Sequence, residues 1–133
     1  MVIPDPLPHD GFSVPLRASF LVFKSAPLFG VATNNAAPRL ALFDDGVEFR
    51  VITRQRRRYE DLEKVDARQK FGTQNIILHW RRNFFAFSGN LGAEVPLIAL
   101  LRFFGGRGIE LTKDAAALTV KHSRQKTRAG ATQ

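Results

Sequence analysis

Alternating apolar and polar side chains predict antiparallel strands over most of the chain. The clearest case is Val47–Ile52 (VEFRVI), where every second residue is apolar, so that one face would be dry and the other solvated. Arg39–Phe43 is a second apolar run, and Asp44-Asp45-Gly46 lies between the two. Because both residues of an Asp-Gly pair tolerate positive φ, such a pair between apolar runs is typical of a hairpin turn. We therefore predict a hairpin over residues 39–52.

Shorter apolar runs bounded by turn residues predict the remaining strands. These are Arg17–Lys24, Val65–Lys70 after one turn over Glu60–Glu63, Asn75–Trp80, and Phe84–Ser88 after a tight turn at Arg81-Arg82-Asn83. Phe29–Thr33 is either a short strand or an irregular connection, Thr53–Arg58 a basic turn or strand end, and Ile109–Leu111 could add one short strand. Within Asn75–Trp80, alternation predicts that Trp80 is buried and that His79 faces solvent.

One amphipathic helix is predicted at residues 93–104. Its buried face would follow the i, i+3, i+4, i+7 spacing and consist of Leu97, Leu100, Leu101 and Phe104. Pro96 is tolerated only in the first turn, and Gly105-Gly106 is predicted to end the helix in the left-handed conformation. Asp114–Val120 could form a marginal helix.

These elements predict a mainly β fold with one C-terminal α-helix. The expected architecture is a bent antiparallel sheet or barrel of about seven strands, whose open end the helix at 93–104 covers. The length of 133 residues suits one domain, and 44% hydrophobic residues can fill its core. We expect an extended Pro-rich arm at 1–15, a single domain at 16–118 and a disordered basic tail at 119–133.

Charge and cysteine content narrow the function classes. The chain has no cysteine, which excludes disulfide scaffolds and thiolate-ligated metals. Its net charge is +8, and the last 13 residues carry no acid. The bases of this tail are Lys121, Arg124, Lys126 and Arg128. The tail would either bind nucleic acid or anionic lipid without specificity or serve as a solubilising end.

The apolar runs are too short to cross a membrane. The longest has seven residues, whereas a spanning helix needs about 20. The first residues, MVIPDPLP, also lack the basic start and apolar block of a secretory signal. We therefore expect a cytoplasmic protein, which a lipid-binding function would bring to the periphery of a membrane.

The sequence predicts no catalytic site, metal site or cofactor. His9, His79 and His122 do not have the spacing of metal ligands, and no serine lies in a Gly-x-Ser-x-Gly frame. The acids at positions 60, 61 and 63 follow a run of arginines, which hold carboxylates ionised and disfavour acid–base catalysis.

Two groups of arginines are candidate anion-binding residues. The first is Arg54, Arg56, Arg57 and Arg58, and the second is Arg81 and Arg82. Guanidinium groups offer two donors to a phosphate or carboxylate, but a basic run beside acids is also typical of a solvated surface. Arg81 and Arg82 lie between Trp80 and Phe84, which indicates either a nucleic-acid contact or a hairpin tip with its aromatics in the core.

The body of the chain resembles the bacterial pleckstrin-homology-like domains, the superfold that includes GRAM domains. The resemblance covers about residues 17–111 and rests on DDGVEFR, the Tyr59–Val65 segment YEDLEKV, NIILHW, FFAFSGN and a terminal helix. It implies a bent seven-stranded sheet capped by a C-terminal helix, in a class of mostly non-enzymatic binding or assembly modules. The lysine-x-arginine pattern of lipid-binding eukaryotic members is absent from the first hairpin.

We therefore expect a non-catalytic module that acts through protein contacts or self-assembly. Binding of anionic phospholipid headgroups through the basic turns is one alternative. Non-specific nucleic-acid binding through the basic tail is another. A fold resemblance alone does not choose among them.

Overall fold

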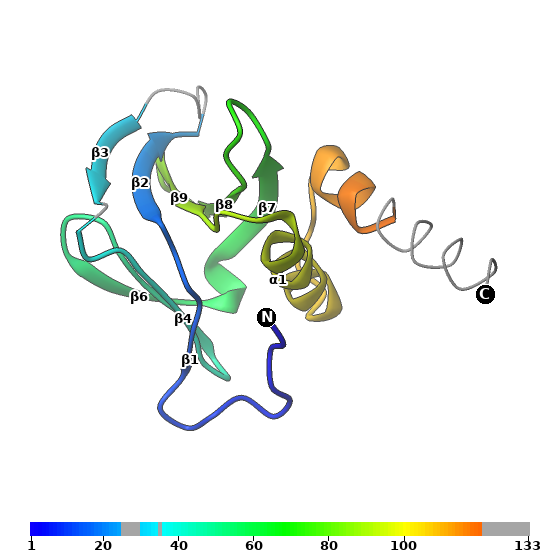
Figure 1. The fold of residues 1–133 in the computed structure, drawn as a ribbon. Helices are drawn as coiled ribbons and strands as arrows, with labels where there is room; N and C mark the ends of the chain where they lie inside the picture. The colour runs from blue at the N-terminus through cyan, green and yellow to red at the C-terminus, as the bar shows by residue number, and fades with distance from the viewer. Residues whose placement is uncertain (25–29, 35, 121–133) are drawn as a thin grey trace.

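Two antiparallel sheets, two α-helices and one short 3₁₀ helix make up the described part of the chain (Figure 1). The computed structural model describes residues 1–24, 30–34 and 36–120. One sheet has the order β1-β4-β5-β6 and contains Phe12–Ser13, Arg39–Leu42, Gly46–Arg50 and Arg54–Arg58. The other has the order β3-β2-β9-β8-β7 and contains Gly30–Asn34, Ala18–Phe23, Phe85–Asn90, Asn75–Trp80 and Leu62–Arg68. A short 3₁₀ helix, η1 (Tyr59–Asp61), connects β6 to β7, and α1 (Glu94–Gly106) follows β9.

The predicted hairpin over residues 39–52 is confirmed, with β4 and β5 paired antiparallel. Its glycine, however, has a different role from the one expected, since Gly46 does not adopt positive φ. Gly46 pairs with Arg58, and a Cβ added at Gly46 would lie 2.0 Å from the carbonyl oxygen of Arg57. The glycine is therefore required because β6 approaches the backbone at this point too closely for any side chain.

The core lies between the two sheets and α1. Phe49 of β5 stacks on Trp80 of β8 at 5.5 Å between ring centroids and contacts Phe87 of β9 at 5.0 Å. The helix packs against β7 and β8. Its predicted apolar face is confirmed, because Leu97, Leu100, Leu101 and Phe104 are all fully buried.

The mainly β class is confirmed, but the expected strand and helix counts are wrong. The described residues form nine strands in two sheets and no closed barrel, and a second helix covers residues 113–120. Residues 54–58 of the segment expected as a basic turn or strand end form the strand β6. This strand pairs with β5 along its whole length, from Gly46↔Arg58 to Arg50↔Arg54. Main-chain pairing at a sheet edge does not need apolar side chains, so hydrophobic alternation cannot detect such a strand.

Both ends of the described chain add to the fold. Residues 1–15, expected as an extended arm, contribute the buried side chains of Leu7 and Val14, and β1 pairs with β4. Near the other end, Ile109–Leu111 forms only a single parallel bridge, Leu111 to Val65. Ala115 of the helix at 113–120 is fully buried. Residues 121–133 of the expected tail lie outside the described residues.

The predicted end of α1 is also wrong by two residues. The helix continues through both glycines to Gly106, and the left-handed glycine is Gly108, with φ of 80°. Gly105 is held inside the last turn, where its missing side chain leaves room for Leu111. A left-handed glycine does follow the helix, but three glycines lie close together and the sequence does not distinguish among them.

Phe104→Ala tests how much the fold depends on α1. Because Phe104 is fully buried and lies beside Phe103 and Tyr59, we expect a loss of about 3–5 kcal/mol in the free energy of unfolding. Urea denaturation followed by Trp80 fluorescence measures it. Val95→Ala, at an exposed position of the same helix, is the matched control and should change stability by less than about 1 kcal/mol. Similar losses in both variants would contradict the assigned burial.

Candidate functional site

The arginines of β6 alternate between the two faces of the first sheet. Arg54, Arg56 and Arg58 are exposed, and each contacts an acid. The nitrogen–oxygen distances are 3.0 Å from Arg54 to Glu48, 2.9 Å from Arg56 to Asp45 and 3.1 Å from Arg58 to Glu60. These three candidate anion-binding residues therefore already have carboxylate partners within the chain.

Arg56 has the most complete set of contacts of the three. Its guanidinium carbon lies 3.8 Å from the ring centroid of Phe43, in addition to its ion pair with Asp45. The hydrogen bond from Arg56 lowers the pKa of Asp45 below its usual value, so this carboxylate stays ionised. An external anion would have to compete with both partners.

Arg57 lies on the opposite face of β6 from these three residues. It stands across from Val47, is half-buried, and donates from Nη2 to Oε1 of Gln55 at 3.1 Å. A charged side chain directed inward from an edge strand opposes the addition of another strand to that edge. Arg57 therefore protects the sheet edge and does not join the outer arginines in an anion site.

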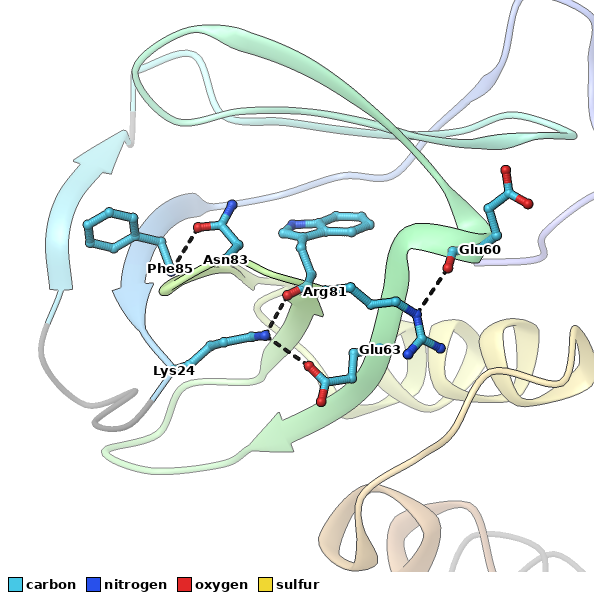
Figure 2. A network of polar contacts seen from close by, with 7 residues as sticks. Lys24, Glu60, Glu63, Arg81, Asn83 and Phe85 are labelled. Atoms are coloured by element: carbon cyan, nitrogen blue, oxygen red, sulfur yellow. Dashed lines mark hydrogen bonds and ion pairs between the residues drawn. The ribbon is translucent and has the colours of Figure 1, made fainter.

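A polar network fixes the turn between β8 and β9, residues 81–84 (Figure 2). Lys24, next to the end of β2, donates to the carbonyl oxygen of Trp80 and to the carboxylate of Glu63, the latter at 2.9 Å. Hydrogen bonding and charge from Lys24 lower the pKa of Glu63. On the other side, Arg81 donates from Nε to the carbonyl oxygen of Glu60 at 3.2 Å.

The same turn exposes an aromatic and a cationic side chain. Phe84 is 86% exposed, although its backbone carbonyl accepts a hydrogen bond from the amide of Lys24 at 3.0 Å. Arg82 has φ of 55°, a left-handed conformation that is strained for arginine, and it makes no ion pair with the described residues. Phe23 is 43% exposed and its ring lies 5.4 Å from that of Phe85. We call Phe23, Arg81, Arg82 and Phe84 the turn surface.

The structure brings only part of the predicted arginine set together. Arg58 and Arg81 meet at Glu60, one through its carboxylate and the other through its carbonyl oxygen. Arg54, Arg56 and Arg57 do not join them. The four predicted tail residues Lys121, Arg124, Lys126 and Arg128 lie outside the described residues.

The two aromatics beside Arg81 and Arg82 have opposite environments. Trp80 is buried, as the core alternative predicted, whereas Phe84 is exposed. Phe84 was expected at the start of a strand, but β9 begins at Phe85 and leaves Phe84 in the turn. The turn is thus one residue longer than the three polar residues Arg81-Arg82-Asn83, because Asn83 accepts a hydrogen bond from the amide of Phe85.

His79 was expected to face solvent, and this prediction is wrong. It is only 4% exposed because β8 lies between β7 and β9, and the face that carries His79 also buries Ile77, Ala86 and Val22. Its Nδ1 has no hydrogen-bond partner among the described residues. Burial, followed by the nearby charge of Lys64, lowers the pKa of His79.

The described residues contain no group of three or more His, Asp or Glu side chains that could hold a metal ion. Tyr59 is half-buried, and this burial raises its pKa to about 12 while its hydroxyl donates to the carbonyl oxygen of Phe43. No helix within the described ranges is long and apolar enough to cross a membrane.

No model of a protein family matches this chain, and no curated protein matches it significantly. The geometry of the turn surface therefore carries the functional argument alone.

His79→Gln should flatten the dependence of stability on pH. Below pH 6.5 the unfolded chain takes up a proton that folded His79 resists, so acidification favours unfolding. The wild-type free energy of unfolding should fall between pH 7 and 5.5 by at most about 1.4 kcal/mol per pH unit. Urea denaturation at both pH values measures this slope.

Among the groups with a shifted pKa, only His79 should change stability between pH 7 and 5.5. The pKa values of Asp45 and Glu63 are lowered, so their contribution to stability is lost only at more acidic pH. The charged neighbours of His79 are Lys24, Glu63, Lys64 and Asp66. His9→Gln, at an exposed position, is the matched control and should keep the wild-type slope. A His79→Gln slope equal to that of the wild type would refute the assignment.

Proposed function

We propose that this protein is a non-catalytic binding module of pleckstrin-homology-like fold that acts through protein contacts or self-assembly. The contact would be made by the turn surface. The observation that carries the proposal is that Phe84 is 86% exposed on a turn that Lys24 and Arg81 hold on both sides. Aromatic and arginine side chains dominate the binding energy of protein interfaces, and a fixed turn loses little entropy when it binds.

Backbone strain at Arg82 supports the same surface. A non-glycine residue with φ near 55° costs roughly 1–2 kcal/mol, which glycine would avoid. Such strained positions cluster at functional sites. Because Arg82 makes no ion pair with the described residues, its guanidinium is available for a contact outside the chain.

Two of the sheet edges are poorly suited to strand addition. The edge strand β6 carries an arginine at four of its five positions, and its Arg57 is directed inward. The edge of β7 is partly occupied, because Val65 exchanges main-chain hydrogen bonds with Glu110 and Thr112. Self-assembly through these edges is therefore disfavoured relative to contact through the turn surface.

The fold-family part of the proposal rests on the order of elements. Antiparallel strands are followed by a helix, α1, that packs on β7 and β8. This order is what the sequence resemblance implies. The described residues differ from it in having nine strands and a second helix at 113–120.

Phe84→Ser should weaken partner binding or self-association by about tenfold or more, because it removes the exposed ring from the contact. Analytical ultracentrifugation over a concentration series measures self-association, and affinity capture with the full chain measures retention of a partner. Phe71→Ser is the matched control. Phe71 is 94% exposed on the turn at the other end of β8 and also has positive φ. A strict monomer without a retained partner, or equal loss in both variants, would contradict the proposal.

Anionic phospholipid binding is a second candidate function. It is favoured by the guanidinium of Arg82, which has no ion pair within the described ranges, beside the exposed ring of Phe84. Arg82→Gly removes the charge while relieving the positive φ, so stability should not fall. Vesicle sedimentation with phosphatidylserine at low salt should then show several-fold weaker binding, since each basic residue near the surface contributes about 1 kcal/mol. Wild-type binding that is absent, or insensitive to salt, would exclude this candidate. Nucleic-acid binding through the tail remains a prediction that deletion of residues 121–133 and a gel shift can test.

A further inference from the structure

A groove of about 640 Å³ lies between the N-terminal segment and α1. Met1–Leu7 forms one wall, with Asp44 of the β4–β5 turn, and Figure 1 shows the N-terminus beside the helix. The other wall consists of Ala99, Arg102, Phe103, Gly106 and Arg107. The volume falls within the range of roughly 300–1,000 Å³ that is typical of small-molecule sites.

The helix wall is a separate stripe from the one that faces the core. Its residues at positions 99, 102, 103 and 106 follow the spacing of one helix face, next to the buried face at 97, 100, 101 and 104, and Arg107 directly follows the last turn of the helix. Gly106 adds space to the groove, since a Cβ placed there would meet no atom within 4 Å. Two stripes on α1 thus have different roles, one in the core and one along the groove.

Arg107 is the cation that the groove holds in a fixed position. Its guanidinium carbon lies 4.3 Å from the ring centroid of Tyr59 and 5.1 Å from that of Phe103. Stacking on aromatic faces orients the guanidinium and leaves its N–H donors in the plane. Arg107 makes no ion pair with any acid in the described ranges. It can therefore donate two parallel hydrogen bonds to a ligand carboxylate.

The other charged groups in the lining restrict the ligand further. Arg102 donates to the carbonyl oxygen of Thr119 at 3.2 Å and is already engaged. Asp5 and Asp44 also line the groove, and because their carboxylates repel anions in proportion to charge, they disfavour a ligand with two negative charges more than one with a single charge. Ile3, Leu7 and Phe103 supply apolar surface.

We propose that this groove binds a small apolar monocarboxylate. The carboxylate would lie on Arg107 and the hydrocarbon part along Phe103 and the N-terminal segment. The site shares no residue with the turn surface, so it stands or falls independently of the proposed function.

Titration of the full chain with octanoate, followed by calorimetry and by amide chemical shifts, tests the proposal. We expect saturable binding at one site with a dissociation constant of about 1 mM or tighter. Octan-1-ol lacks the charge and octyl phosphate carries more than one, so both should bind about tenfold more weakly. Equal binding of octanoate and octan-1-ol, or no saturation with octanoate, would overturn the proposal.

Two variants separate the site from the fold. Arg107→Gln should weaken octanoate binding about tenfold, and Gly106→Leu should abolish it by filling the groove. Because leucine is a better helix former than glycine and meets open space, Gly106→Leu should also unfold at a temperature no lower than the wild type. Lys70→Gln, which removes an exposed cation outside both the groove and the turn surface, is the control and should bind octanoate normally. Undiminished octanoate binding by Gly106→Leu would place the ligand elsewhere and refute the site.

Discussion

The contact of Phe49 with Trp80 and Phe87 is the interaction on which the rest of the structure depends. The two sheets have separate hydrogen-bonded ladders, so side-chain packing must hold them face to face. Phe49 extends from the first sheet and meets two strands of the second, with ring centroids 5.0–5.5 Å apart. Stacked and tilted aromatic pairs contribute beyond the area they bury. The position of η1, and with it Glu60, follows from this packing because η1 joins the two sheets.

The turn surface is held in place by contacts to η1 and to the start of β7, where the two sheets are joined. Glu60 lies on η1 and accepts the hydrogen bond from Arg81, while Glu63 lies on β7 and pairs with Lys24. The turn between β8 and β9 is thereby tied to two segments that are distant in sequence, Lys24 after β2 and residues 60–63 of η1 and β7. Residues of a turn usually lose conformational entropy when they bind a partner. The hydrogen bonds of Lys24 and Arg81 already restrict the turn in the free protein and therefore reduce that loss.

Hydrophobic periodicity predicted the elements whose side chains fill the core. It located β2, β4, β5, β8, β9 and α1 with errors of a few residues, because their apolar positions repeat with the period of the structure they form. It did not identify β6 as a strand, since an edge strand of arginines is stabilised by main-chain pairing and by acids on its neighbours. It also predicted wrongly that His79 faces solvent. A strand between two others can be buried on both faces, and alternation then does not show which residues are exposed.

The candidate site was only half predictable for a related reason. Arg81 and Arg82 were found because charge and turn residues are visible locally. The exposure of Phe84 depends on where β9 begins, and the backbone bond to Asn83 sets that point. The alternative of a solvated basic run beside acids is confirmed for Arg58, which pairs with Glu60 two residues along the chain. The partners of Arg54 and Arg56 are Glu48 and Asp45, and finding these two pairs required the register of β5 against β6, which no local pattern contains.

The close approach at Gly46 limits which substitutions the β5–β6 pair can accept. The contact is with a main-chain oxygen, so no compensating substitution on β6 can make room for a larger residue. A methyl group there would force β6 away from β5, and Arg54 and Arg56 would then move away from Glu48 and Asp45 together. The space that this glycine leaves empty therefore keeps two surface ion pairs in register.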